Sequence, residues 1–319
     1  MGLVASGIWM RDAVLGCLLG TAVGDAMGLP YEGLPRRRIP VGICGHGWFF
    51  GRGMTSDDTE HTWIVVEALQ AAQGDVAIFE RELGRGLRRW FLSMPPALGW
   101  ATLRACMKLV LGFGPGRSGV FSAGNGPAMR SAVIGVWFRE DVHSIQTFVR
   151  SCARVTHTDP KAAYGALAVA LAAAGRSEVF GELCPDKEFV ERVRLAGDGV
   201  FDPGRGVSGY IYDTVPAALA VCSRHGDDYR GAVLEAISFG GDTDTVAAIV
   251  GAIVGARVGA AGIPREWVEG IWDWPRNVDA MRRLAGGERV RLGYFGLVGR
   301  NWVFFVIALW HAVVTILRR

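Results

Sequence analysis

The segment Ser238-Phe-Gly-Gly-Asp-Thr-Asp-Thr245 leads directly into an apolar run from Val246 to Ala256. A run that is apolar on every side is typical of a helix buried in a protein core. The two glycines before it can turn the chain sharply, because they lack a Cβ. Two carboxylates therefore stand at the start of a buried helix, where a charge costs free energy unless a counter-charge compensates it.

Two interpretations of this segment are open. Asp and Thr are favoured N-cap residues, and acidic side chains suit the first turn of a helix, so Asp242, Asp244 and Thr245 could cap it. The same side chains offer the oxygen ligands that Mg, Mn and Ca prefer. One residue would be enough for a cap, whereas such an ion needs about six partners. A metal site therefore requires further ligands from elsewhere in the chain.

A second acidic cluster, Ser56-Asp57-Asp58, precedes another segment of helical periodicity. The apolar positions of that segment are Val65, Val66, Leu69 and Ala72. Any one residue of the cluster could simply cap the helix. The positive ends of two helix dipoles repel cations, however, so carboxylates from both helix starts would be needed to hold metal ions between them. Together the two clusters supply enough oxygens for a two-metal site.

The segment from Ala13 to Gly28 carries a glycine at every fourth position, at residues 16, 20, 24 and 28. These glycines fall on one face of a helix and allow another backbone to approach closely. Asp25 interrupts the segment near its end, either to fix the helix end by a hydrogen bond or to act directly in catalysis. No segment of the chain shows a convincing alternation of apolar and polar residues. We therefore predict an all-α fold, a bundle of tightly packed Ala- and Gly-rich helices.

A glycine-rich passage ends in Gly124-Asn125-Gly126, directly before Pro127. Proline suits the first position of a helix, and the backbone N–H groups ahead of it would be free to cradle a phosphate. The passage lacks the Lys-Ser/Thr pair of a P-loop. Further along, His157 precedes the helical segment 161–171. It is either a residue of the capping loop or a side chain that faces the same cleft.

Composition bounds the class of protein. The chain has 319 residues, half of them hydrophobic, and its 34 basic and 31 acidic residues give a net charge of +3. So small a charge does not indicate a nucleic-acid partner. Six cysteines lie far apart along the sequence, which is typical of free thiols in a reducing compartment. The N-terminus lacks the basic region of a secretory signal, so we expect a cytoplasmic protein.

The C-terminal segment 302–317 contains no charged residue and is followed by Arg318 and Arg319. Sixteen residues fall short of the roughly 20 that usually span a membrane, and His311 would cost free energy in lipid. The segment is either a membrane anchor or a helix docked on the domain or on a partner chain. We therefore divide the chain into a catalytic domain, 1–290, and an apolar C-terminal helix, 291–319.

Taken in chain order, the motifs resemble the ADP-ribosylglycohydrolase family, which includes the dinitrogenase-reductase activating glycohydrolases and the ADP-ribosyl-arginine and ADP-ribosyl-serine hydrolases. The resemblance covers roughly residues 11 to 275 and implies an all-α fold with two Mg or Mn ions. It rests on the glycine pattern up to Gly28, on 56–59, on 124–130, on Thr156-His157 and on 240–245.

The resemblance also implies roles for individual residues. The metal ligands would be Ser56, Asp57, Asp58, Asp242, Asp244 and Thr245. Glu32 and Asp58 would be catalytic, and the residues that bind the substrate would be Ser122, Gly124, Asn125, Gly126, Met129 and His157. Two features depart from the family: Ala123 stands where some members carry an aromatic residue, and the apolar tail from Tyr294 onward has no counterpart.

The expected function is the metal-dependent removal of ADP-ribose from the side chain of a modified protein, by attack of an activated water on the anomeric carbon. The motif Ser56-Asp-Asp-Thr59 favours the arginine-linked type. Two alternatives stay open at this point. The chain could bind ADP-ribose without catalysis, or it could hydrolyse a free small molecule that resembles ADP-ribose.

Overall fold

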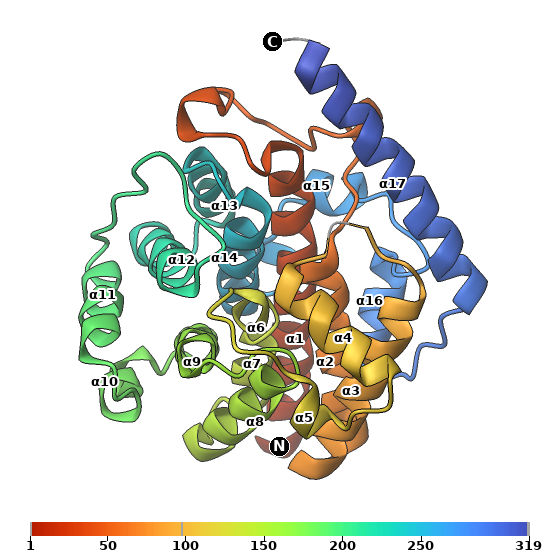
Figure 1. Ribbon diagram of the computed structural model, residues 1–319. Helices are drawn as coiled ribbons and strands as arrows, with labels where there is room; N and C mark the ends of the chain where they lie inside the picture. Colours follow the sequence, from red (N-terminus) through yellow and green to blue (C-terminus); the bar gives the residue numbers. More distant parts are fainter. Residues whose placement is uncertain (1, 97, 318–319) are drawn as a thin grey trace.

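The computed structural model describes residues 2–96 and 98–317, which form α-helices joined by loops (Figure 1). Within these residues, extended backbone pairs only at isolated bridges, so the all-α prediction is confirmed. The helices of the first half are α1 (Gly2–Gly28), α2 (Asp57–Ala72), α3 (Val76–Leu92), α4 (Trp100–Val110), α5 (Pro115–Ser118), α6 (Gly126–Met129), α7 (Ala132–Trp137) and α8 (Val142–Arg154). The others are α9 (Pro160–Ala174), α10 (Phe180–Leu183), α11 (Lys187–Gly197), α12 (Ile211–His225), α13 (Tyr229–Ser238), α14 (Thr243–Val258), α15 (Arg265–Gly270), α16 (Val278–Ala285) and α17 (Tyr294–Leu317).

The glycine face of α1 packs against α14 in the middle of the bundle (Figure 1). A Cβ added to Gly16, Gly20 or Gly24 would lie 2.1, 2.0 and 2.0 Å from a backbone carbonyl oxygen of α14, closer than any real contact. The two helix backbones therefore touch, as the spacing of four predicts. This contact fixes Asp25, the neighbour of Gly24, beside the first turn of α14.

The start of α2 is capped from two directions. Its own N-cap, Ser56, accepts a hydrogen bond from the backbone N–H of Asp58 at 3.2 Å. The carboxylate of Asp25 accepts from the backbone N–H groups of Ser56 and Thr59 at 2.8 and 3.2 Å, and from the Thr59 hydroxyl at 2.5 Å. Asp25 therefore fixes a helix end by hydrogen bonds, one of the two roles left open above. The end that it fixes is the start of α2, not the end of its own helix.

The loops after α1 and before α14 pair with each other at the same end of the bundle. The backbone N–H of Gly33 donates to the Gly241 carbonyl at 2.8 Å, and the Gly241 N–H donates to the Leu34 carbonyl at 2.7 Å. Gly241 has φ of +80°, and a Cβ there would lie 2.0 Å from the carbonyl oxygen of Val207. Only glycine fits this position. The pairing holds Glu32 close to Asp242.

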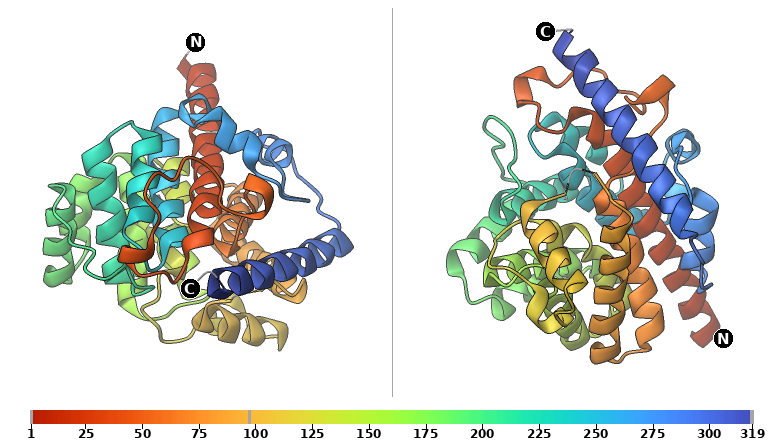
Figure 2. Two further views of the ribbon diagram at one scale, coloured as in Figure 1. Left: turned by 90° about the horizontal axis from the view of Figure 1, so that it is seen from above. Right: turned by 45° about the vertical axis from the view of Figure 1, so that its right-hand side comes forward.

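The C-terminal helix α17 lies along the outside of the bundle and packs against it through one face (Figure 2). Phe304 and Ile307 on that face form a small apolar cluster with Trp48, Leu29 and Met54. The opposite face is apolar and exposed, with Trp302, Val306, Leu309 and Trp310 each more than half exposed. Arg318 and Arg319, which close the sequence, lie outside the described residues.

The helix that could cross a membrane by its length and composition lies near the N-terminus, and not in the C-terminal segment 302–317, for which two interpretations were open. Among the described residues, the helix that is long and apolar enough to cross a bilayer is Met10–Tyr31, and 94% of its apolar stretch is buried inside the protein. A central helix of a large bundle is apolar on all sides because other helices surround it. The high hydropathy of Met10–Tyr31 is therefore explained by its burial in the core of the protein.

Candidate metal centre and substrate cleft

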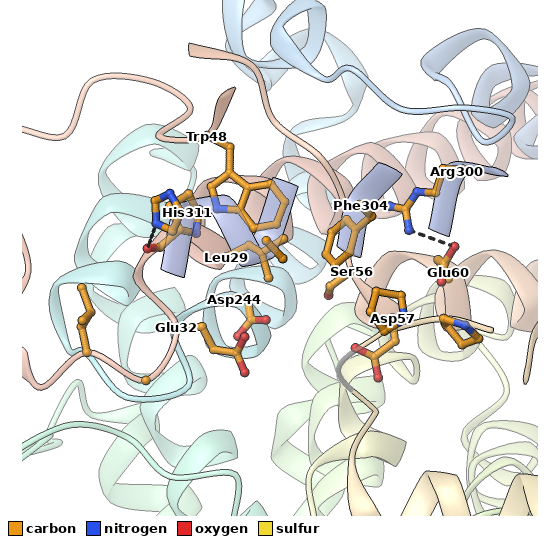
Figure 3. Close-up of a pocket in the computed structure, with 16 residues that line it drawn as sticks. Leu29, Glu32, Trp48, Ser56, Asp57, Glu60, Asp244, Arg300, Phe304 and His311 are labelled. Carbon is orange, nitrogen blue, oxygen red and sulfur yellow. Dashed lines mark hydrogen bonds and ion pairs between the residues drawn. The ribbon is translucent and has the colours of Figure 1, made fainter. Parts of the chain in front are cut away.

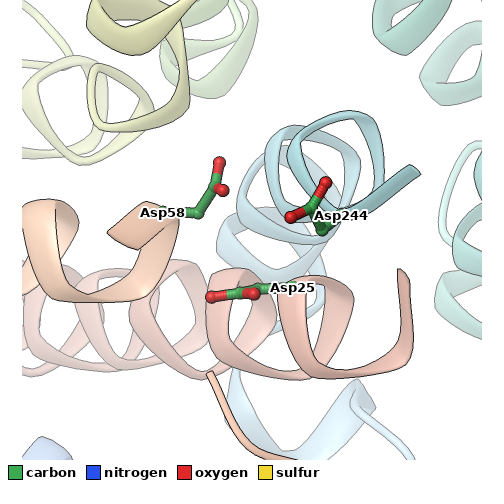
Figure 4. Close-up of side chains that lie close together, drawn as sticks. All are labelled: Asp25, Asp58 and Asp244. Atoms are coloured by element: carbon green, nitrogen blue, oxygen red, sulfur yellow. The ribbon is translucent and has the colours of Figure 1, made fainter. Parts of the chain in front are cut away.

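Three buried carboxylates converge from three different helices (Figure 4). Asp25 comes from α1, Asp58 from the first turn of α2 and Asp244 from the first turn of α14. Each offers an oxygen within 4.8 Å of the others, and all three side chains are at most 5% exposed. The two acidic clusters of the sequence are thus brought together, with Asp25 as an additional member.

Electrostatics at this cluster favour a bound cation. Burial raises the pKa of Asp25 to about 7, against the opposing effect of its hydrogen bonds, and raises the pKa of Asp58 and Asp244 well above the usual value. Burial, with the nearby charge of Asp25, raises the pKa of Asp57 to about 8. Within the described residues, no ion pair joins a Lys or Arg to Asp25, Asp58 or Asp244. One oxygen of Asp58, Oδ1, is buried with no hydrogen-bond partner. An oxygen-rich cluster with an unused buried oxygen fits a hard divalent cation.

The other predicted ligands surround this triad. The hydroxyls of Ser56 and Thr245 donate to Oδ2 of Asp58 at 3.1 and 3.3 Å. Asp242 makes no side-chain cap on α14 and instead accepts from Nδ2 of Asn125 at 2.7 Å. The capping interpretation of Asp242 is therefore wrong for this side chain, which is directed toward the glycine-rich loop.

A cavity of about 410 Å³ opens above the carboxylates (Figure 3). Glu32, Asp57 and Asp244 line its acidic side. Partial burial raises the pKa of Glu32, and the charge of Asp242 adds to this effect. The apolar side is formed by Leu29, Pro30, Trp48, Pro95, Pro96, Phe304 and Ala308. Two of these residues belong to α17, which the sequence analysis did not connect with the site.

The glycine-rich loop meets the acidic cluster at Asp242, through the side chain of Asn125. The N–H of Gly124 donates to the Ser122 hydroxyl at 3.3 Å, and Asn125 also donates to the Thr214 hydroxyl at 3.1 Å. The imidazole of His157 fills the space behind the loop, because a Cβ on Gly124 or Gly126 would lie 3.2 or 3.0 Å from it. Ser122, Gly124, Asn125, Gly126 and His157 are thus together.

Met129 is placed differently from the other predicted substrate-binding residues. Its side chain is 4% exposed and belongs to the main hydrophobic core. Its backbone carbonyl accepts a hydrogen bond from the Thr62 hydroxyl at 3.3 Å. Met129 therefore supports the loop from below and connects it to α2.

Arg130 is a buried cation beneath the same loop, and the sequence analysis assigned it no role. Its guanidinium is fully buried and donates to the Gly126 carbonyl at 3.1 Å and to the Thr156 hydroxyl at 2.7 Å. Burial, helped by the charge of Arg130, lowers the pKa of His157 to about 3. The imidazole is therefore neutral near pH 7. The positive charge beneath the loop is that of Arg130, and it suits an anionic ligand.

The family model of the ADP-ribosylglycohydrolases matches residues 9–293. The chain belongs to the ADP-ribosylglycohydrolase family. The enzymes of this family hydrolyse glycosidic bonds of ADP-ribose, and this assignment confirms the resemblance drawn from the motifs. The match ends at residue 293, directly before α17 begins.

Relatives with assigned activities extend over most of the chain. The ADP-ribosyl-dinitrogen reductase glycohydrolase of Rhodospirillum rubrum is 28% identical, over 87% of this chain and 98% of its own length. The ADP-ribosylarginine hydrolase Tri1 of Pseudomonas putida is 30% identical, over 85% of this chain and 76% of its own. A solved structure, an ADP-ribosylglycohydrolase-related protein complex, aligns with a TM-score of 0.67 and 27% identity over 87% of this chain and 97% of that one.

A pH-dependent stability is expected from the acidic cluster of this glycohydrolase. The folded pKa values of Asp25 and Asp57, about 7 and about 8, lie above the value of about 3.9 in an unfolded chain. The unfolded chain therefore gives up these protons first as the pH rises, so stability falls between about pH 4 and pH 8. Since each unit of pKa difference corresponds to about 1.4 kcal/mol, we expect the metal-free protein to lose a large part of its unfolding free energy over this range.

Thermal unfolding in chelator at pH 5 and pH 8 measures this loss. Addition of Mg²⁺ or Mn²⁺ should raise Tm more at pH 8 than at pH 5, because the cation binds only the ionised carboxylates. A metal-free Tm that is equal at both pH values, with no gain from either cation, would contradict the assignment of the cluster.

Proposed function

We propose that this enzyme removes ADP-ribose from arginine side chains of modified proteins with the help of two Mg²⁺ or Mn²⁺ ions. The observation that carries the proposal is the convergence of Asp25, Asp58 and Asp244 next to both a glycine-rich loop and a cavity. The arginine linkage is supported by the relative from Pseudomonas putida, which is an ADP-ribosylarginine hydrolase.

The proposed metal ligands come from both acidic clusters and from α1. They are Asp25, Ser56, Asp57, Asp58, Asp242, Asp244 and Thr245. When bound, divalent cations would neutralise these carboxylates and polarise the oxygen atoms of water and ribose that they contact. The chain itself holds the carboxylates in place through the contact of α1 with α14 and through the hydrogen bonds from Ser56 and Thr245.

The substrate would lie across the carboxylates with its diphosphate on the loop. Among the loop residues, the Ser122 hydroxyl and the Gly126 N–H would donate to the diphosphate above the buried charge of Arg130. Gly124 and Asn125 would shape the loop, because their N–H groups and the Asn125 amide already donate to protein oxygens. Neutral His157 would line the same part of the cleft as a hydrogen-bonding group and not as a proton donor. Met129 would act indirectly, through the core beneath the loop.

Hydrolysis would form a bond between a water oxygen and the anomeric carbon and break the bond from that carbon to the guanidino nitrogen. The water gives one proton to a carboxylate, and that proton passes on to the guanidine nitrogen as the guanidine departs. Of the two predicted catalytic residues, Glu32 suits the proton acceptor better. Asp58 is held by two hydroxyls, whereas the Glu32 side chain makes no hydrogen bond in the described part of the chain and borders the cavity.

We also propose a cytoplasmic location, which the six free cysteines support. The partner would be an ADP-ribosylated protein, with no nucleic acid involved. Contact of the exposed face of α17, within 302–317, with a membrane stays a prediction.

The decisive experiment measures release of ADP-ribose from an arginine-linked and a serine-linked substrate, with Mg²⁺, with Mn²⁺ and with chelator. We expect release from the arginine-linked substrate that the chelator abolishes. Release only from the serine-linked substrate would overturn the linkage. No release from either, with ADP-ribose still bound in calorimetry, would indicate a non-catalytic binder or an enzyme for a free small molecule.

A further inference from the structure

The helix α17 is fastened to the segment that leads into the first acidic cluster. Arg300 is 2% exposed and donates to both carboxylate oxygens of Asp273, at 3.0 and 2.8 Å, and to the carbonyl of Thr55. Asp273 in turn accepts from the N–H and the hydroxyl of Thr55 at 3.1 and 2.6 Å. Thr55 directly precedes Ser56. A buried ion pair with all these partners permits one geometry, so α17 has a fixed position relative to the site.

Beyond Arg300, the same face of α17 forms one wall of the cavity. Phe304, Ala308 and His311 follow at intervals of four and three residues, so they lie on one side of the helix. The ring of Phe304 lies 5.1 Å from that of Trp48, and the His311 ring is hydrogen-bonded to the Pro30 carbonyl at 3.0 Å. Figure 3 shows these side chains opposite Glu32, Asp57 and Asp244. The cavity thus has an aromatic wall and an acidic floor.

The glycine-rich loop does not form part of this cavity. None of Ser122 to Gly126 lines the cavity, and neither does His157. Asn125 of the loop reaches the cluster through Asp242, which is not part of the cavity wall either. A substrate with its diphosphate on the loop and its anomeric carbon over the carboxylates would direct its remaining bond toward α17.

We propose that the cavity between α17 and the carboxylates binds the side chain on the leaving side of the scissile bond, and that α17 selects the linkage. This inference rests on the proposed function. The α17 residues of the cavity wall, Arg300, Phe304, Ala308 and His311, lie beyond the matched region of the family, 9–293. The selection would therefore be a property of this chain and not of the family.

The chemistry of the cavity fits a guanidinium. That group is a flat, weakly hydrated cation that packs on aromatic rings and pairs with carboxylates. The charge of Arg300 does not oppose the binding of a guanidinium, since Asp273 neutralises Arg300. A carboxylate oxygen of Glu60 also lies 3.6 Å from the Arg300 guanidinium. A volume of about 410 Å³ is at the small end of ligand sites, which suits one extended side chain.

The variant Ala308→Trp tests the proposal in the full-length enzyme. Ala308 is half-buried in the wall, and an indole there would fill the cavity without touching the loop. We expect kcat/KM for free ADP-ribosyl-arginine to fall at least tenfold, whereas the Kd for ADP-ribose changes less than twofold. The matched control is Leu309→Trp, at the next and mostly exposed position, which should leave both values unchanged.

A second variant, Phe304→Leu, tests the proposal independently in case Ala308→Trp does not fold. It removes an aromatic ring from the wall and keeps an apolar side chain, so KM for the arginine-linked substrate should rise while kcat changes little, and its Tm shows whether the variant is folded. Wild-type kcat/KM in folded Ala308→Trp, or equal losses in catalysis and in ADP-ribose affinity, would overturn the subsite. A different result would refute the proposed function: no release of ADP-ribose from the arginine-linked substrate by the unmodified enzyme. That result would refute the proposed subsite as well.

Discussion

Asp244→Asn is expected to lower kcat/KM by about a thousandfold. The substitution keeps the size of the side chain and the hydrogen bond that Oδ1 accepts from the Thr245 N–H at 2.9 Å, but it removes one of the three converging charges. A bound cation contributes several kcal/mol of charge stabilisation, and about 4 kcal/mol corresponds to a thousandfold change in rate. Release of ADP-ribose from the arginine-linked substrate at saturating Mg²⁺ or Mn²⁺ measures the loss.

The same variant, which loses activity, should keep or gain thermal stability in the absence of metal. Burial raises the pKa of Asp244 because its ionised form is costly there. The metal-free Asn variant should therefore unfold at the same or a higher temperature than the parent at pH 8, and added Mn²⁺ should no longer raise its Tm. Asp227→Asn, an exposed acid paired loosely with Arg257, is the control and should match the parent in all three measurements. An active Asp244→Asn enzyme would refute the metal site.

Gly24→Ala is expected to cost about 3 kcal/mol of unfolding free energy, the upper end of the usual range for overpacking. The new Cβ would lie 2.0 Å from the carbonyl oxygen of Ala247 and 2.6 Å from its carbon. Backbone atoms cannot rotate away as a side chain does, so α1 and α14 must separate. Since Asp25 and Asp244 are carried by these two helices, we expect metal affinity to fall as well.

Chemical denaturation of the metal-free protein measures the stability, and titration with Mn²⁺ measures the affinity. The control is Gly299→Ala, an exposed glycine inside α17 with no atom within 4 Å of the added Cβ. There the better helix propensity of alanine should raise stability by up to about 1 kcal/mol. A Gly24→Ala protein as stable as the parent would show that the backbone contact in the middle of the bundle is not needed.

The sequence by itself determined the elements and the chemistry of the site. Periodicity indicates helices, a glycine at every fourth residue indicates a close helix contact, and the clusters at 56–58 and 242–245 indicate oxygen ligands. Each of these signals is local: it depends on neighbours within one or two turns of the chain. The order of the motifs then identified the family, since five motifs in the right order rarely coincide by chance.

Only the tertiary structure decided which distant groups share the site. Asp25 is a single acid in an apolar helix. It joins the cluster because α1 touches α14 and because the Asp25 carboxylate caps α2. Arg130 lies under the loop, and Met129 lies in the core. The apolar tail has the composition of a membrane segment, yet buried Arg300 and Phe304 fix it over the cavity. Local pattern shows that a face is apolar, but the surface that covers it is set by contacts between residues hundreds of positions apart.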